Sequence, residues 1–315
     1  IRDRGLSKDI PVSQFPAKLV LELRSLTRKY YDLTDERSAH INKLKGDLHT
    51  VFPQYLDVFC DVTGKTSTMI LRQYGTPDKI LRGHKKTMIE KISKASRKGL
   101  AKASERYEKL CAAANAAKTF GCQIDSIYFN IFLTLDLVEK LDSALDSILN
   151  RIRQLITFNK NEKFIQQIKL LNTIPGVGFL TAVTIMCEIG DFSAFRNPKQ
   201  LFAYFGLDPE VNESGKFVGT QLHMSKRGSR IARRAIFAVA LASIRTKRNG
   251  EGINPYLRKY YELKSGQKPK MVAIGAVMHK VCNIVFAVLR DEKAFELRSP
   301  EEHCKQYQRP ALAAA

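Results

Sequence analysis

Two short stretches of the chain combine residue types that can recognise a phosphate group. The first, Pro-Gly-Val-Gly at residues 175–178, lies between two apolar runs, and Gly176 and Gly178 allow close backbone approach because they lack a Cβ atom. Backbone N–H groups that converge where the next helix begins can hold a phosphate, and the helix dipole adds to the attraction. An ordinary corner between two core helices is the alternative reading of the same residues.

The second stretch gathers cations around another predicted helix start. Ser225-Lys226-Arg227-Gly228 precedes a helix with three arginines in its first turns, where cations oppose the helix dipole. A bound anion would explain this placement, although a solvated basic face also remains open for any one arginine. Ser225 fits the N-cap position of this helix. The predicted nucleic-acid contacts are Gly176, Gly178, Lys216, Lys226, Arg227, Arg230, Arg233 and Arg234.

The overall charge favours a polyanionic partner. The 315 residues include 52 Lys and Arg against 31 Asp and Glu, which gives a net charge of +21 and a pI near 9.8. An imbalance of this size exceeds what solubility alone requires and is typical of proteins that bind nucleic acid.

The six cysteines show no spacing typical of a zinc site or of a disulfide framework, so we expect them to be reduced. The N-terminus lacks the apolar core of a signal peptide, and no uninterrupted apolar run is long enough for a membrane span. We therefore expect a soluble, cytoplasmic protein with no membrane partner and no metal site of its own.

The elements that must position these residues are mainly α-helical. Apolar residues spaced by threes and fours between residues 16 and 51, and again between 127 and 155, predict two long helices that pair as an antiparallel coiled coil. An exposed apolar stripe on such a pair is costly in water, so we expect a homo-oligomer, a dimer or a tetramer. Only the segment "GKFVGTQLHM" alternates enough to predict a short hairpin.

Between the two long helices lies a basic segment that starts a helix at Thr76-Pro77-Asp78. Its lysines and arginines fit a solvated face and a nucleic-acid contact surface equally well. Apolar periodicity stops near residues 157–163, where we place a domain boundary. The predicted organisation is a linker at 1–16, a coiled-coil region with a basic helical insert at 17–160, a compact helical domain at 161–292 and a tail at 293–315.

The order of motifs in the last domain resembles a known family. "LLNTIPGVGFLTAVTIMCEIGDFSAFRNPKQLFAYFGLDP", "ESGKFVGTQLHMSKRGSRIARRAIFAVALAS" and "NPYLRKYYELKSGQKPKMVAIGAVMHKVCNIVFAVL" are similar to the C-terminal half of Piv-type DNA invertases and insertion-sequence transposases. Some members of that family are guided by a bridge RNA. The Pro-Gly-Val-Gly turn also resembles a helix-hairpin-helix DNA-binding motif. The resemblance implies a transposase or site-specific recombinase with DNA and a guide RNA as partners.

The resemblance also implies a catalytic serine and a metal. The family uses four acidic residues of a RuvC-like N-terminal domain to bind Mg²⁺, and a serine of the C-terminal domain as the nucleophile. The residue that matches this serine is Ser214, in "NESGKF". Ser225 is the second candidate.

The chain departs from the family in its first residues. We find no counterpart of the acidic set, so residues 1–16 resemble the connection that leads out of the acidic domain, and we expect the chain to be a fragment or a natural truncation. We expect the chain by itself to be inactive. The alternative function is a non-catalytic module that binds DNA or RNA and oligomerises.

Overall fold

The computed structural model describes residues 17–210, 213–214, 217–218, 223–299 and 301–302. These residues are mainly helical, which confirms the predicted fold class. The helices are α1 (Lys18–Val51), α2 (Tyr55–Val58), α3 (Lys65–Gln73), α4 (Pro77–Arg82), α5 (Lys85–Ser96), α6 (Leu100–Phe120), α7 (Asp125–Phe158), α8 (Lys163–Leu171), α9 (Phe179–Ile189), α10 (Pro198–Tyr204), α11 (Arg230–Ser243), α12 (Pro255–Ser265) and α13 (Lys270–Asp291), with a 3-10 turn at Phe192–Ala194. Two short strands, β1 (Glu213–Ser214) and β2 (Phe217–Val218), pair antiparallel as a hairpin.

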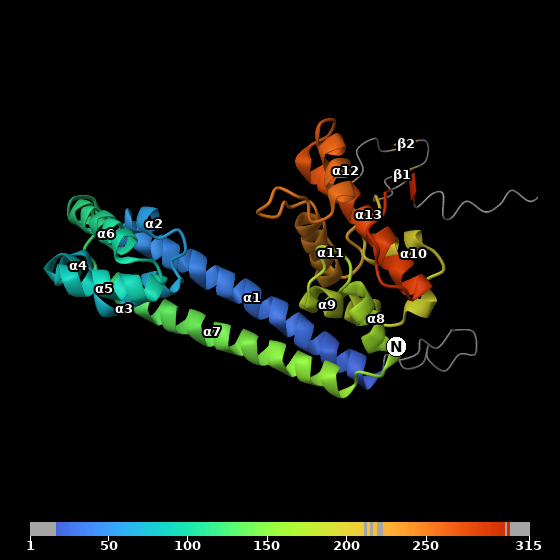
Figure 1. Cartoon of the computed structure of the whole chain (residues 1–315), viewed down its shortest axis with the longest axis horizontal. Coiled ribbons are helices and arrows are strands. Elements are labelled where there is room, and N and C mark those ends of the chain that lie inside the picture. The colour runs from blue at the N-terminus through green and yellow to red at the C-terminus, as the bar shows by residue number, and fades with distance from the viewer. Residues whose placement is uncertain (1–16, 211–212, 215–216, 219–222, 300, 303–315) are drawn as a thin grey trace, which may run out of the picture. The chain divides into compact units, whose positions relative to one another are not determined.

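The chain divides into two compact units. Unit 1 consists of residues 1–29 and 149–315, and unit 2 consists of residues 30–148. The division falls within the length of α1 and of α7, so each long helix contributes one end to each unit. Figure 1 shows the order of the elements along the chain.

Within unit 2, α1 and α7 lie side by side (Figure 1). Arg37 of α1 forms a bidentate ion pair with Asp142 of α7, and the hydroxyl of Tyr128 donates a hydrogen bond of 3.4 Å to the carbonyl of Val51. The second contact lies further along α1 but nearer the start of α7, so the two helices run antiparallel. The two predicted helices are confirmed, while regular heptad packing between them stays a prediction.

Helices α2 to α6 form the rest of unit 2, where α6 packs against α2, α4 and α5. Helix α4 begins where the sequence predicted, because Thr76 accepts a hydrogen bond from the backbone N–H of Lys79 and Pro77 occupies the first helical position. The core includes Tyr55, which is fully buried and whose hydroxyl lies 2.9 Å from the hydroxyl of Ser67. This hydrogen bond offsets the cost of removing the Tyr55 hydroxyl from water.

Unit 1 is organised around α13, which packs against α8, α10, α11 and α12. Among the described residues, α13 is the one helix long and apolar enough to cross a membrane by length and composition. Much of this helix is buried inside the protein, including Val277, Val281 and Val285, as expected for a core helix of a helical domain. The five cysteines in the described part of the chain are all free thiols.

Candidate active site and nucleic-acid interface

An antiparallel stem leads from the core of unit 1 to the hairpin that carries Ser214. We define the stem as residues 205–210 paired with residues 223–228. The backbone N–H of Lys226 donates to the carbonyl of Gly206 at 3.0 Å, that of Ser225 to Asp208 at 2.8 Å, and that of Glu210 to His223 at 2.7 Å. Strands β1 and β2 lie further along the same hairpin, with Ser214 opposite Phe217. Ser214 is therefore placed on a hairpin, at a position that its local sequence alone does not specify.

The stem is tightly joined at its base. A Cβ atom on Gly228 would overlap the carbonyl oxygen of Tyr204, and one on Gly206, where φ is +66°, would overlap the backbone nitrogen of Gly228. Glycine is required at both positions because two backbones touch there. Arg233 of α11 donates from Nη1 to the carbonyls of Phe205 (3.2 Å) and Gly228 (2.7 Å), and so connects the base to α11.

The interpretation of Ser225 as the N-cap of the basic helix is wrong. The cap of α11 is Ser229, whose hydroxyl accepts a hydrogen bond of 3.2 Å from the backbone N–H of Ala232. Ser225 lies in the stem, where its hydroxyl donates to Oδ1 of Asp208 at 2.6 Å. The pairing of the stem keeps Ser225 away from the helix start.

The predicted basic contacts fall into different environments. Lys226, Arg227 and Arg230 have exposed side chains beside the base of the stem, while Arg234 is half-buried on α11. Arg233 is half-buried and bound to the stem, so it has a structural role whatever else it contacts. Lys216 lies outside the described residues. Three exposed cations therefore flank the hairpin that holds Ser214.

Sequence reasoning missed the buried carboxylate of Glu188, which lies beside the start of α11. The side chain of Glu188 is only 2% exposed and receives two hydrogen bonds of 2.9 Å from Arg28 of α1. It is also hydrogen-bonded to Ser229, the cap of α11, and lies in the field of Arg24. The one signal in the sequence was a single acidic residue inside the apolar helix "FLTAVTIMCEI", because a buried charge needs a partner.

The surroundings of Glu188 hold it ionised. Burial by itself raises the pKa of this carboxyl, but the hydrogen bonds from Arg28 and Ser229 and the charges of Arg28 and Arg24 outweigh burial, so the pKa lies below its ordinary value. The Glu188 backbone is tied as well, since its carbonyl accepts a hydrogen bond of 3.1 Å from the hydroxyl of Tyr204. The contacts of Glu188 therefore connect α9 to α1, to the end of α10 and to the start of α11.

The Pro-Gly-Val-Gly turn lies between α8 and α9, and its two glycines have different surroundings. Gly176 has φ +95°, and a Cβ atom there would lie 2.6 Å from Oγ of Ser243 on α11. The same hydroxyl donates to the carbonyl of Pro175 at 3.0 Å, so Gly176 is a packing residue. Gly178 is the N-cap residue of α9, has open space at its Cβ position, and makes no side-chain cap. The Cβ position is therefore open at Gly178 and filled by Ser243 at Gly176.

The basic insert of unit 2 is partly self-paired. Lys109 pairs with Glu105 at 2.8 Å and Lys118 with Asp78 at 2.6 Å, as a solvated face would. Exposed cations also line α5 and α6 and the turn between them, as a contact surface would; they include Lys86, Lys94, Lys98 and Lys102.

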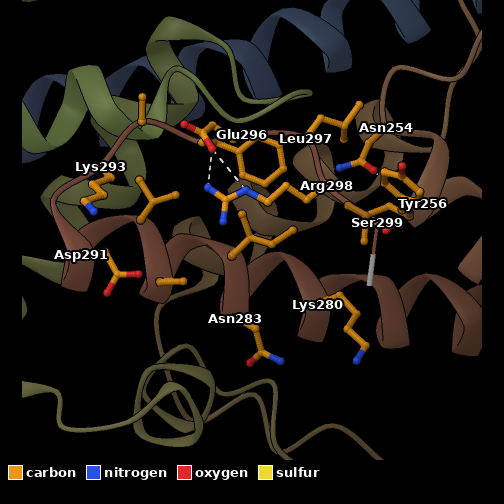
Figure 2. Close-up of a pocket in the computed structure, with 16 residues that line it drawn as sticks. Asn254, Tyr256, Lys280, Asn283, Asp291, Lys293, Glu296, Leu297, Arg298 and Ser299 are labelled. Carbon is orange, nitrogen blue, oxygen red and sulfur yellow. Dashed lines mark hydrogen bonds and ion pairs between the residues drawn. The ribbon is translucent and has the colours of Figure 1, made fainter. Parts of the chain in front are cut away.

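A cavity of about 370 Å³ lies elsewhere in unit 1, between α13 and residues 293–299 (Figure 2). Apolar side chains such as Leu257 and Val288 line it, and Arg298 pairs with Glu296 at its edge. None of the predicted site residues contributes to its wall. The described residues also hold no group of three or more His, Cys, Asp and Glu side chains that could bind a metal ion.

A comparison with known protein families finds a match in the second half of the chain. Residues 168–262 match the model of the Transposase IS116/IS110/IS902 family, and this matched segment contains the glycine turn, the stem, Ser214 and the basic start of α11.

Relatives with related names match more of the chain. An uncharacterised 43.6 kDa protein of insertion element IS110 from Streptomyces coelicolor is 23% identical over 286 residues, which cover 90% of this chain and 66% of that protein. The pilin gene-inverting protein of Moraxella bovis is 30% identical over 177 residues, 56% of this chain and 52% of that protein. The transposase for insertion sequence element IS1111A of Coxiella burnetii is 26% identical over 188 residues, 58% of this chain and 50% of that protein. The chain thus spans about half to two thirds of the length of these relatives.

Proposed function

We propose that the chain is the coiled-coil and C-terminal part of a transposase or site-specific DNA recombinase in which Ser214 is the nucleophile. The observation that carries the proposal is the position of Ser214 on a hairpin whose stem is flanked by the exposed cations Lys226, Arg227 and Arg230. The family match covers this whole arrangement, and relatives named as a transposase and as a gene-inverting protein support the reaction class.

The chemistry asked of Ser214 is transesterification. Its oxygen attacks phosphorus, the bond to the sugar oxygen breaks, and the proton of the serine hydroxyl ends on the departing sugar hydroxyl. One phosphate ester replaces another, so the phosphoserine link conserves the energy of the phosphodiester bond. A hydroxyl of a different strand can then attack the phosphoserine, release the serine and rejoin the DNA. No external energy source is required.

The cations serve to hold the substrate. Each Lys or Arg that neutralises a phosphate releases condensed counterions, which favours binding at low salt. Lys226, Arg227 and Arg230 would hold the DNA backbone beside the hairpin, and the open start of α9 at Gly178 offers backbone N–H groups to one more phosphate. The attacking oxygen and the phosphorus are thereby brought together before the reaction.

The family resemblance extends the proposal to Mg²⁺ and a guide RNA, and the sequence patterns extend it to a homo-oligomer in the cytoplasm. No group among the described residues fits Mg²⁺, so we derive no step through the metal and assign none of these residues to it. The guide RNA rests on the resemblance and on the net charge of +21. Self-association is supported by an exposed apolar stripe on α7, formed by Phe129, Leu133 and Leu137.

The second candidate function is a non-catalytic module that binds nucleic acid and oligomerises. The net charge and the α7 stripe favour it, because neither feature requires a reaction. The two functions differ in one observable, since only a recombinase forms a covalent bond to DNA.

The test is the capture of that bond. The chain is joined to the acidic domain of a relative, incubated with DNA and Mg²⁺, denatured and run on a gel that separates protein with attached DNA. We expect an adduct that Ser214→Ala abolishes, with DNA affinity nearly unchanged, because the substitution removes the attacking atom and few contacts. Ser265→Ala, at the end of α12, is the control and should form the adduct normally.

Two results would contradict the proposal. An adduct of normal yield in Ser214→Ala would remove Ser214 from the reaction, and no adduct in any variant, with DNA binding intact, would favour the binding module. We also expect the 315-residue chain without the acidic domain to form no adduct.

A further inference from the structure

The link between Ser225 and Asp208 is a double one. The backbone N–H of Ser225 donates to the carbonyl of Asp208 at 2.8 Å, and the hydroxyl of Ser225 donates to the carboxylate of the same residue at 2.6 Å. A hydrogen bond from a hydroxyl to a charged oxygen is among the stronger ones in proteins and is short for that reason. The same two residues are therefore joined through main chain and side chain at one point of the stem.

The other end of the stem cannot slide. The backbones touch at Gly206 and Gly228, where a Cβ atom on either residue would overlap a main-chain atom of the opposite segment, and Arg233 bonds a carbonyl on each side. A one-residue change of register would bring a residue with a side chain to a place that accepts only glycine. The register at the base is therefore fixed to α11.

The Ser225–Asp208 pair lies between this fixed base and the strand that carries Ser214. Beyond the pair, the described contacts are one backbone hydrogen bond, from Glu210 to His223, and the short pairing of β1 with β2. Two strands of two residues each hold little structure by themselves. The last side-chain link between the stem and Ser214 among the described residues is thus the Ser225–Asp208 hydrogen bond.

We propose that Ser225 and Asp208 are positioning residues, which hold the hairpin at the angle and register that bring Ser214 to a DNA phosphate. This inference rests on the proposed role of Ser214. An attacking oxygen must be placed within a fraction of an ångström, and a displacement of about 1 Å can slow a reaction by roughly 100-fold. Neither residue is required to touch the substrate.

A rival interpretation uses the same hydrogen bond. A serine hydroxyl that donates to a carboxylate has the arrangement of a nucleophile beside its base. In that case Ser225 would be the attacking residue and Asp208 would take its proton. The two interpretations predict different results for the same pair of serine variants.

The first measurement needs no reaction. Amide hydrogen exchange in the 315-residue chain is followed in Ser225→Ala and in Ser225→Thr, which keeps the hydroxyl. We expect Ser225→Ala to speed exchange at Ser214, Phe217 and Val218 while the amides of α11 and α13 stay at the wild-type rate, and Ser225→Thr to restore slow exchange. Faster exchange throughout unit 1 would show a general structural role and overturn the proposal.

The second measurement is the rate of adduct formation in the chain joined to an acidic domain. We expect Ser225→Ala and Asp208→Ala to lower the rate by roughly 10- to 100-fold, with DNA affinity within about twofold of wild type. The double variant should be no slower than the slower single variant, because both remove one interaction. Ser225→Thr should react at close to the wild-type rate.

The outcomes distinguish the positioning role of Ser225 and Asp208 from the proposed role of Ser214 as the nucleophile. An unchanged rate in Ser225→Ala overturns the positioning role, and complete loss of the adduct in Ser225→Ala, with the adduct kept in Ser214→Ala, assigns the nucleophile to Ser225. If Ser214→Ala and wild type behave alike, the proposed function fails, yet the exchange experiment still reports whether the pair holds the hairpin.

Discussion

Replacing Gly176 by alanine tests whether the glycine turn is built for packing. Its φ of +95° lies outside the conformations that alanine adopts readily, and the added Cβ atom would lie 2.6 Å from Oγ and 3.0 Å from the backbone nitrogen of Ser243. Both obstacles arise in the folded state alone. The neighbouring Gly178 has neither, because its φ is −86° and its Cβ position is open.

The expected loss of stability follows from these two terms. A residue with a Cβ atom at positive φ costs about 1–2 kcal/mol, and forcing a methyl group into a packed site costs about 1–3 kcal/mol more. We therefore expect Gly176→Ala to lower the free energy of unfolding by about 3 kcal/mol, or roughly 10 °C in melting temperature for a unit of this size. For Gly178→Ala we expect a change of about 0.5 kcal/mol or less.

The assay is urea unfolding, followed by circular dichroism at about 222 nm, where the signal reports helix content. Adding Ser243→Ala to Gly176→Ala should recover part of the loss, because it removes the nearest atom but leaves the strained φ and deletes the hydrogen bond to Pro175. Equal stability of Gly176→Ala and wild type would refute the reasoning. The DNA affinity of Gly178→Ala tests whether the turn also binds DNA. Weaker binding by this variant, at wild-type stability, would place a phosphate at the start of α9.

Four further outcomes are expected. Arg28→Ala should cost about 2 kcal/mol at neutral pH, less than for a fully buried pair because Arg28 is 52% exposed. The pKa of Glu188 is depressed in the folded state, so wild-type stability from this carboxylate is present above its ordinary pKa of about 4.3 and is lost as pH falls through the folded value. Unfolding curves at several pH values check this, and the acid-dependent loss should be smaller in Glu188→Gln. Lys226→Gln and Arg227→Gln should each reduce the slope of log affinity against log salt by about one unit, with Lys18→Gln as an inert control; unchanged slopes would assign both residues to a solvated face. Leu133→Lys combined with Leu137→Glu should shift sedimentation from oligomer to monomer without loss of helix, because both side chains are exposed at 46% and 43% on one face of α7; a wild-type chain that sediments as a monomer at micromolar concentration would contradict this.

Local sequence was sufficient for the helices and for several of their ends. Apolar residues repeat every three or four positions along α1 and α7, and such a stripe is stable only as a helix with one buried face. Thr76 and Pro77 start α4 through a hydrogen bond that spans three residues. The exposure of Lys226 and Arg227 also followed from residue type, because charged heads stay in water unless a partner is present.

Tertiary structure decided which residues of the candidate site meet. Glu188 is paired with Arg28, 160 residues away, and the role of Gly176 depends on Ser243 of α11; no local pattern encodes either contact. By sequence Ser225 fits the N-cap of the basic helix, but the pairing of the stem puts Ser225 on Asp208, and Ser229 caps α11. Local propensity acts over a few residues, whereas a buried charge, a close backbone approach or a strand register is set by whichever distant segment the folded core brings against it.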